Sequence, residues 1–102
     1  MIRRSVALSP EAEADLLDLG EWIADAASID VAVRYVQRVE RYVLSFDLAS
    51  ERGSLHADIS PSLRVVGFEG RLTIAFRVSD AIVQVVGIFR AGQDWAALVK
   101  DR

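Results

Sequence analysis

Three arginines are the residues in this sequence whose type and placement could do chemistry. Arg64, Arg77 and Arg90 fall one in each of three consecutive apolar segments. Guanidinium groups can stabilise the charge that develops on a phosphate during RNA cleavage, but that reaction also needs a base and an acid. Arginine stays protonated at neutral pH and is a poor base. A catalytic interpretation therefore depends on a further side chain.

Few side chains could supply that base. The chain has no cysteine, and its single histidine is His56. His56 lies in a polar stretch ahead of the apolar segments, so we interpret it as an ordinary loop residue. Asp94 could act as a base, but a carboxylate close to a phosphate is unfavourable. The same counts exclude a thiolate nucleophile and a multi-histidine site, so we expect no metal and no cofactor.

A binding surface is the alternative. The three arginines form a basic patch if the strand register aligns them, and are separate surface side chains if it does not. Phe89, Trp95 and Leu98 could add an apolar landing site, because aromatic residues and arginine are enriched at interface hot spots. Trp95 could equally cap the core.

Composition limits the class of protein. The chain of 102 residues predicts a single domain over residues 1–102, and 52% hydrophobic residues suffice for a core. The net charge of −3 excludes nucleic-acid binding by bulk electrostatics, although residues 62–102 hold 6 basic and 4 acidic residues. No apolar run approaches the roughly 18 residues of a membrane span, and the N-terminus does not resemble a signal peptide. We therefore expect a cytoplasmic protein without membrane contact.

Two amphipathic helices are expected in the first half. Ser9 and Pro10 suit the start of one helix, and Ser28 suits the start of the next. Trp22 borders the apolar stripe of the first helix, so we interpret it as the edge of the core. The stripes are Ala12, Leu16, Leu19, Ile23 and Ala26, then Ala32, Val36, Val39, Val43 and Phe46.

A sheet is expected in the second half. The segments 62–69, 71–78 and 81–89 are rich in β-branched and aromatic residues, and short turns separate them. Gly67 and Gly87 indicate a bulge or a close backbone approach. Residues 2–8 predict a further strand, residues 47–61 a loop, and Asp94 could cap a short last helix. The expected fold is α+β: an N-terminal strand and an antiparallel two-helix hairpin packed on a mainly antiparallel four-stranded sheet, with a short C-terminal helix.

The order of these elements and their residues resembles ParE toxins of the RelE/ParE superfamily. No single motif is specific, but the ordered set covers nearly the whole chain. It comprises residues 9–16, Trp22 to Ala24, Ala32 with Tyr35, Leu63 and Arg64 with Gly67, residues 74–78, residues 83–88 and Arg90.

The resemblance implies the toxin half of a type II toxin–antitoxin pair. A ParD-like antitoxin, with a ribbon-helix-helix DNA-binding part and a tail that wraps the toxin, would form a hetero-oligomeric complex with it. ParE toxins inhibit DNA gyrase without catalysis, and no direct DNA binding by the toxin alone is expected. The target or the antitoxin would contact the sheet and the C-terminal segment, at Arg64, Arg77, Phe89, Arg90, Trp95 and Leu98.

Two alternatives stay open from the residues alone. RelE relatives are ribosome-dependent mRNA endoribonucleases, and the three arginines would then line an active site. A toxin-fold protein that has lost its target would persist as an antitoxin-bound interaction module. The missing base disfavours the endoribonuclease.

Overall fold

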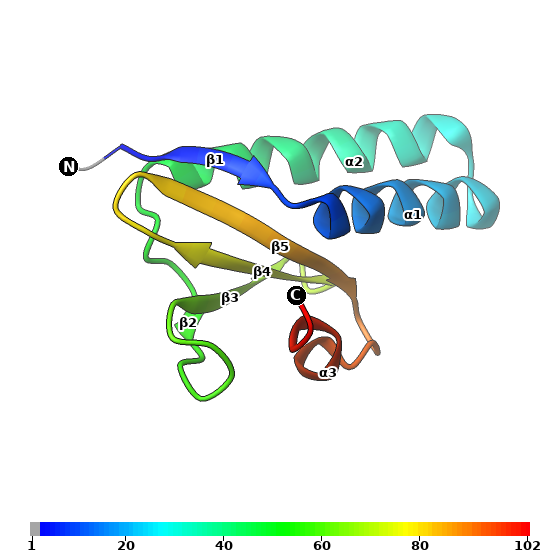
Figure 1. The fold of residues 1–102 in the computed structure, drawn as a ribbon. Coiled ribbons are helices and arrows are strands. Elements are labelled where there is room, and N and C mark those ends of the chain that lie inside the picture. Colours follow the sequence, from blue (N-terminus) through cyan, green and yellow to red (C-terminus); the bar gives the residue numbers. More distant parts are fainter. Residues whose placement is uncertain (1–2) are drawn as a thin grey trace.

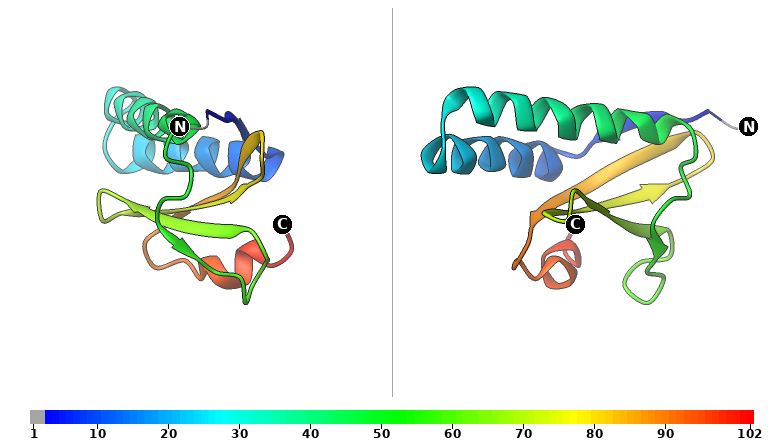
Figure 2. Two further views of the ribbon diagram at one scale, coloured as in Figure 1. Left: turned by 90° about the vertical axis from the view of Figure 1, so that its left-hand side faces the viewer. Right: turned by 180° about the vertical axis from the view of Figure 1, so that it is seen from behind.

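A computed structural model describes residues 3–102 and places helices on both faces of one sheet (Figure 1). The five strands are ordered β1-β5-β4-β3-β2. A helical hairpin of α1 and α2 covers one face, and α3 lies against the other (Figure 2). The elements are β1 (Ser5–Leu8), α1 (Pro10–Ala26), α2 (Ile29–Leu44), the short 3-10 helix η1 (Ser45–Asp47), β2 (Ser54–Leu55), β3 (Leu63–Phe68), β4 (Leu72–Val78), β5 (Ile82–Arg90) and α3 (Trp95–Val99).

Side-chain caps define the start of each α-helix. The Ser9 hydroxyl accepts a hydrogen bond from the Ala12 amide at 3.1 Å, and the Ser28 hydroxyl accepts one from Val31 at 3.1 Å. The Asp94 carboxylate accepts from the Ala97 amide at 3.2 Å. All three predicted helix starts are confirmed, because N-capping depends on neighbouring residues alone.

The sheet is antiparallel from β2 to β5 and parallel between β1 and β5. The predicted meander is confirmed. The prediction of four strands is wrong, because Ser54 and Leu55, within the expected loop 47–61, pair with Val65 and Arg64 as a fifth strand. A strand of two residues is too short for an alternation of apolar and polar side chains to be recognised in the sequence. The predicted first strand begins at residue 2, which lies outside the described residues; within them it runs from Ser5 to Leu8.

One strand, β5, carries a hydrophobic core on each face. In the pairing of β4 with β5, Ala75 lies opposite Gly87 and Phe76 lies opposite Val85. Val86 therefore has no partner and is the extra residue of a β-bulge. Val83, Val85 and Ile88 join the core beneath α1 and α2, while Val86 and Phe89 join the smaller core beneath α3. Side chains of a regular strand alternate between the two faces, and the bulge shifts this alternation so that Ile88 returns to the α1–α2 face and Phe89 to the α3 face.

The bulge also explains Gly87. A Cβ atom at this position would overlap the Phe89 ring and would lie 3.2 Å from Nη1 of Arg102. Gly67 differs, because a Cβ there would have its nearest neighbour, the Leu72 carbonyl oxygen, at 3.8 Å. The register of β4 and β5 confirms the bulge expected at Gly87, where the close neighbour is a side chain. The register of β3 and β4 is continuous through Gly67, so the bulge expected there is wrong.

The Asp15 carboxylate joins α1, β5 and the last residues of the chain. It accepts a hydrogen bond from the Ile88 amide at 3.0 Å, just past the bulge. Arg102 donates to it from Nη1 at 2.5 Å and from Nη2 at 3.2 Å, and its Nη1 also donates to the Val86 carbonyl at 3.2 Å. The Arg102 guanidinium covers the Phe89 ring, 5.0 Å from its centroid. The hydrogen bonds of Asp15 and Arg102 therefore hold α1 on one face of β5 and the C-terminal residues on the other.

Replacing Asp15 by Asn removes the charge that the Arg102 guanidinium and the Ile88 amide share. The side chains of Asp15 and Arg102 are only 16% and 19% exposed, so the stranded guanidinium is poorly hydrated. We expect Asp15→Asn to lower the free energy of unfolding by about 2 kcal/mol. Urea unfolding measures it, with Asp18→Asn, an exposed carboxylate of the same helix, as control. Equal unfolding midpoints for the two variants would contradict the assigned role.

The two strand glycines give a matched pair. Gly87→Ala should destabilise the protein by about 1–3 kcal/mol, because the methyl group collides with the buried Phe89 ring. Gly67→Ala places the methyl group at ordinary van der Waals distance from its nearest neighbour and should change the unfolding temperature little. Thermal unfolding followed by circular dichroism compares them, and an equal loss in both variants would argue against the packing described at the bulge.

Candidate functional site

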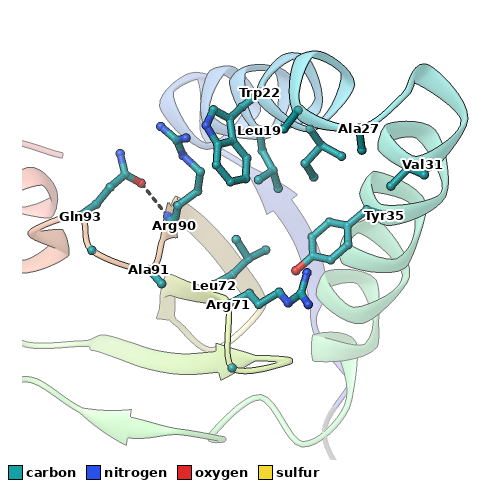
Figure 3. A pocket seen from close by; sticks show the side chains of 14 residues that line it. Leu19, Trp22, Ala27, Val31, Tyr35, Arg71, Leu72, Arg90, Ala91 and Gln93 are labelled. Atoms are coloured by element: carbon teal, nitrogen blue, oxygen red, sulfur yellow. Dashed lines mark hydrogen bonds between the residues drawn. The ribbon is translucent and has the colours of Figure 1, made fainter.

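A groove of about 630 Å³ lies between the tip of the helical hairpin and one end of the sheet (Figure 3). Its walls come from the second half of α1, the start of α2, the β3–β4 turn and the segment after β5. The lining includes Leu19, Trp22, Ile23, Ala26, Ala27, Val31, Tyr35, Arg71, Leu72, Arg90 and Gln93.

The groove exists because the helical hairpin extends beyond the sheet. In Figure 1 the tip of α1 and α2 projects past the end of β5, which slants away from the helices. The apolar stripe of α1 continues along that projecting part, so Ala26 is exposed although Ala12, at the other end of the stripe, is fully buried. Apolar side chains therefore line a surface that no part of residues 3–102 covers.

Two hydrogen bonds and one stacking contact hold the floor of the groove. The Ala91 amide donates to the Arg71 carbonyl at 2.9 Å, which joins the segment after β5 to the start of β4. The Arg90 amide donates to the side-chain oxygen of Gln93 at 2.6 Å, which holds the following turn (Figure 3). The Arg90 guanidinium lies over the Trp22 indole, 4.7 Å from the ring centroid, and links the sheet to α1.

Trp22 is 53% exposed and forms part of the groove wall. The interpretation of Trp22 as an edge of the core is therefore wrong. Its stripe position is correct, but the sheet ends before it reaches this turn of α1. Only the tertiary arrangement shows that.

Tyr35 contributes the one buried side-chain polar atom without a hydrogen-bond partner among the described residues. Its side chain is 7% exposed, and in Figure 3 its hydroxyl points toward Arg71 across the groove. The ring lies under the Arg38 guanidinium and edge-on to Phe68. Burial, with a smaller contribution from the charge of Glu69, raises the pKa of Tyr35 above 10.0.

An ion pair of Arg38 with Glu69 lies beside Tyr35. Arg38 of α2 donates to both Glu69 carboxylate oxygens, from Nε at 3.1 Å and from Nη2 at 3.0 Å. These hydrogen bonds lower the pKa of Glu69. Glu69 has a φ of 53° at the β3–β4 turn, where Gly70 follows with a φ of 67°. The pair holds this turn against α2.

The register separates the three arginines. Arg77 pairs with Leu63, so it lies on the α3 face, whereas Arg64 and Arg90 pair with Phe76 and Leu72 on the other face. Arg64 is engaged with the backbone: it donates to the Arg52 carbonyl at 3.0 Å and to the Glu51 carbonyl at 3.2 Å. Arg77 donates to the Ser60 hydroxyl at 3.3 Å. The conditional patch of three arginines does not form.

The predicted apolar landing site is also not assembled. Phe89 is 1% exposed in the core beneath α3, and Trp95 is partly buried against the same core. His56 packs edge-on against Trp95 at a centroid distance of 5.0 Å. Leu98 alone of the three apolar candidates is exposed, at 42%. Of the six predicted contact residues, only Arg90 lines the groove.

No metal site is assembled within the described residues. They contain no group of three or more potential metal-ligating side chains. Asp94, the possible base, caps α3. In residues 3–102 no helix has the length and apolar character needed to cross a membrane. The groove, apolar with two guanidiniums, is suited to binding.

Comparison with known proteins identifies relatives of this sequence and fold. A family profile described as "ParE toxin of type II toxin-antitoxin system, parDE" matches residues 6–95. A solved structure titled "Chromosomal ParDE TA system from P. aeruginosa" has a TM-score of 0.76 at 21% identity, covering 88% of this chain and 98% of that one. It confirms the expected α+β fold. No curated protein sequence matches significantly.

Tyr35→Phe tests the buried hydroxyl. Near neutral pH we expect no loss of stability, because an unpartnered buried hydroxyl contributes no hydrogen bond. Since the folded-state pKa of Tyr35 is raised, the parent protein should lose stability as the pH rises above about 10, where the unfolded chain ionises first. The variant should lose less. Urea unfolding between neutral and alkaline pH tests this; parallel curves would contradict the burial of the hydroxyl.

Proposed function

The chain belongs to the family of ParE toxins of type II toxin–antitoxin systems, and on that premise we propose that it inhibits DNA gyrase. A ParD-like antitoxin with a ribbon-helix-helix part holds it inactive in a hetero-oligomeric complex in the cytoplasm. The observation that carries the proposal is the family match, which spans every element from β1 to the start of α3.

The arrangement of the arginines favours binding over catalysis. An RNA-cleaving site needs cations that converge on one phosphate together with a base. Here Arg77 lies on the opposite face of the sheet from Arg64 and Arg90, and the Arg64 side chain donates to backbone carbonyls. An inhibitor of gyrase needs only a complementary surface, for which Arg90, Trp95 and Leu98 remain candidate contacts.

A supercoiling assay tests the proposal. The purified full chain is incubated with gyrase and relaxed plasmid, and in parallel with intact ribosomes and a labelled message. We expect loss of supercoiling and an uncut message, because the chain acts by occupying gyrase. A cut message with normal supercoiling would establish the endoribonuclease instead. No effect in either assay would support the target-less interaction module.

Single arginine variants sharpen this assay. Arg64→Gln, Arg77→Gln and Arg90→Gln should weaken gyrase inhibition unevenly, with Arg90→Gln the most affected, because interface energy concentrates in a few residues. An enzyme would instead lose orders of magnitude in message cleavage when one phosphate-stabilising arginine is removed.

A further inference from the structure

We propose that two copies of this chain associate through the outer face of the helical hairpin, with α1 of each copy lying along α2 of the other. The outer face is the side of α1 and α2 that is turned away from the sheet, and its exposed residues include Leu17, Glu21, Val33, Arg34, Arg41 and Leu44. None of these residues lines the groove. The inference goes beyond the proposed function and does not depend on it.

Exposed apolar side chains occur on the outer face of both helices. Leu17 is 65% exposed although Leu19 is buried, because residues two positions apart point to opposite sides of a helix. Val33 and Leu44 are 49% and 59% exposed, and the eleven positions between them are close to three turns, so they share one side of α2. The views in Figure 2 show no other element of residues 3–102 on this side of the hairpin.

The outer face is acidic along α1. This helix has six carboxylates and no basic residue. Of the six, Asp15 alone takes part in an ion pair within residues 3–102. The exposed Glu21 follows Leu17 by one helical turn, so the two side chains lie on the same side of α1. A partner for this side of α1 must therefore supply positive charge.

The other helix, α2, supplies positive charge on its outer side. Arg34 and Arg41 are exposed, form no ion pair within residues 3–102 and are two helical turns apart. Arg34 donates to the Asp30 carbonyl at 3.4 Å. Glu40 lies one turn after Val36, which packs against α1 of its own hairpin, so this carboxylate adjoins that helix. The outer face is therefore self-complementary, and a second copy of the chain has the charges that match it.

The register of the hairpin brings the opposite charges to the same level. A Cβ atom at Gly20 would lie 3.4 Å from Cγ2 of Val36, so these two positions stand side by side. Because the helices are antiparallel, Arg34 is level with residue 22 (Figure 1). A twofold axis parallel to the helices keeps these levels and lays α1 of one copy over α2 of the other. Glu21 then faces Arg34 of the second copy, and this contact occurs twice.

The same arrangement pairs the other end of the hairpin. Arg41 is level with residue 15, so in the second copy it lies between the exposed carboxylates of Glu13 and Asp18. Leu17 lies between the two charged contacts and is covered by the second copy. Opposite charges therefore flank an apolar side chain in each half of the interface.

The size of the outer face indicates a weak dimer. The two helices have 17 and 16 residues, so each is roughly 25 Å long and the pair is about 20 Å wide. The contact would bury about 500 Å² of each copy, compared with about 800 Å² per partner in a standard interface. We therefore expect reversible association whose specificity comes from the charges.

Analytical ultracentrifugation of the purified full chain tests the inference. We expect a monomer–dimer equilibrium in the micromolar range that raised salt shifts toward monomer, because the contacts join exposed charges. A chain that stays monomeric up to about 1 mM at low salt would overturn the inference. The same result is expected if the outer face binds a different protein.

Two charge reversals identify the surface. Glu21→Arg and Arg34→Glu should each weaken self-association about tenfold or more, because each reversal creates two like-charged contacts in the symmetric dimer. An equimolar mixture of the two variants should dimerise again, since both contacts of the mixed pair join opposite charges. Failure of the mixture to dimerise would overturn the inference.

A control variant separates this surface from general electrostatics. Asp58→Arg makes the same change of charge at an exposed loop position next to Ile59, which packs in the core beneath α3. We expect it to leave the dimer unchanged, and circular dichroism establishes that each variant is folded. Equal weakening by Asp58→Arg and Glu21→Arg would overturn the inference. The test uses neither gyrase nor antitoxin, so its outcome is separate from that of the supercoiling assay.

Discussion

The fold depends on one carboxylate beside one β-bulge. The extra residue in β5 interrupts the register with β4, and the Asp15 side chain of α1 accepts a hydrogen bond from the amide of Ile88 just beyond it. Arg102 then binds the same carboxylate and covers the Phe89 ring. A buried ion pair is favourable when further hydrogen bonds satisfy its atoms, and here the backbone on both sides of the bulge supplies them.

That contact has consequences at the other end of α1. Because Asp15 fixes the first half of the helix against β5, the second half must extend past the sheet, and the apolar side chains that it carries stay uncovered (Figure 1). The ion pair of Arg38 with Glu69 and the stacking of Arg90 on Trp22 keep the resulting groove open. A site built on helices and strands in this way is pre-organised, so binding costs little ordering of the toxin.

Local residue patterns were enough to predict the helices, the three long strands and the caps. Each helix cap accepts a hydrogen bond from an amide three residues further along the chain, as Ser9, Ser28 and Asp94 do. A short segment therefore contains everything needed to predict the start of a helix. The faces of the arginines could not be predicted, because they depend on register and on which residue bulges. The contact of Asp15 with Arg102 spans 87 positions, and nothing in the acidic first helix sets Asp15 apart. In the sequence Tyr35 only flanks the apolar stripe of the second helix. The absence of a hydrogen-bond partner for its hydroxyl depends on the position of the turn after β3, which the sequence does not give.

The central claim is that the Asp15 carboxylate, shared by the Arg102 guanidinium and the Ile88 amide, holds α1 and the C-terminal residues against β5. The most direct measurement is a double-mutant cycle that combines Asp15→Asn with Arg102→Gln and follows the free energy of unfolding in urea. The account predicts that the double variant loses clearly less stability than the sum of the losses in the two single variants. Additive losses would contradict it, because they would mean that the two side chains do not act on each other.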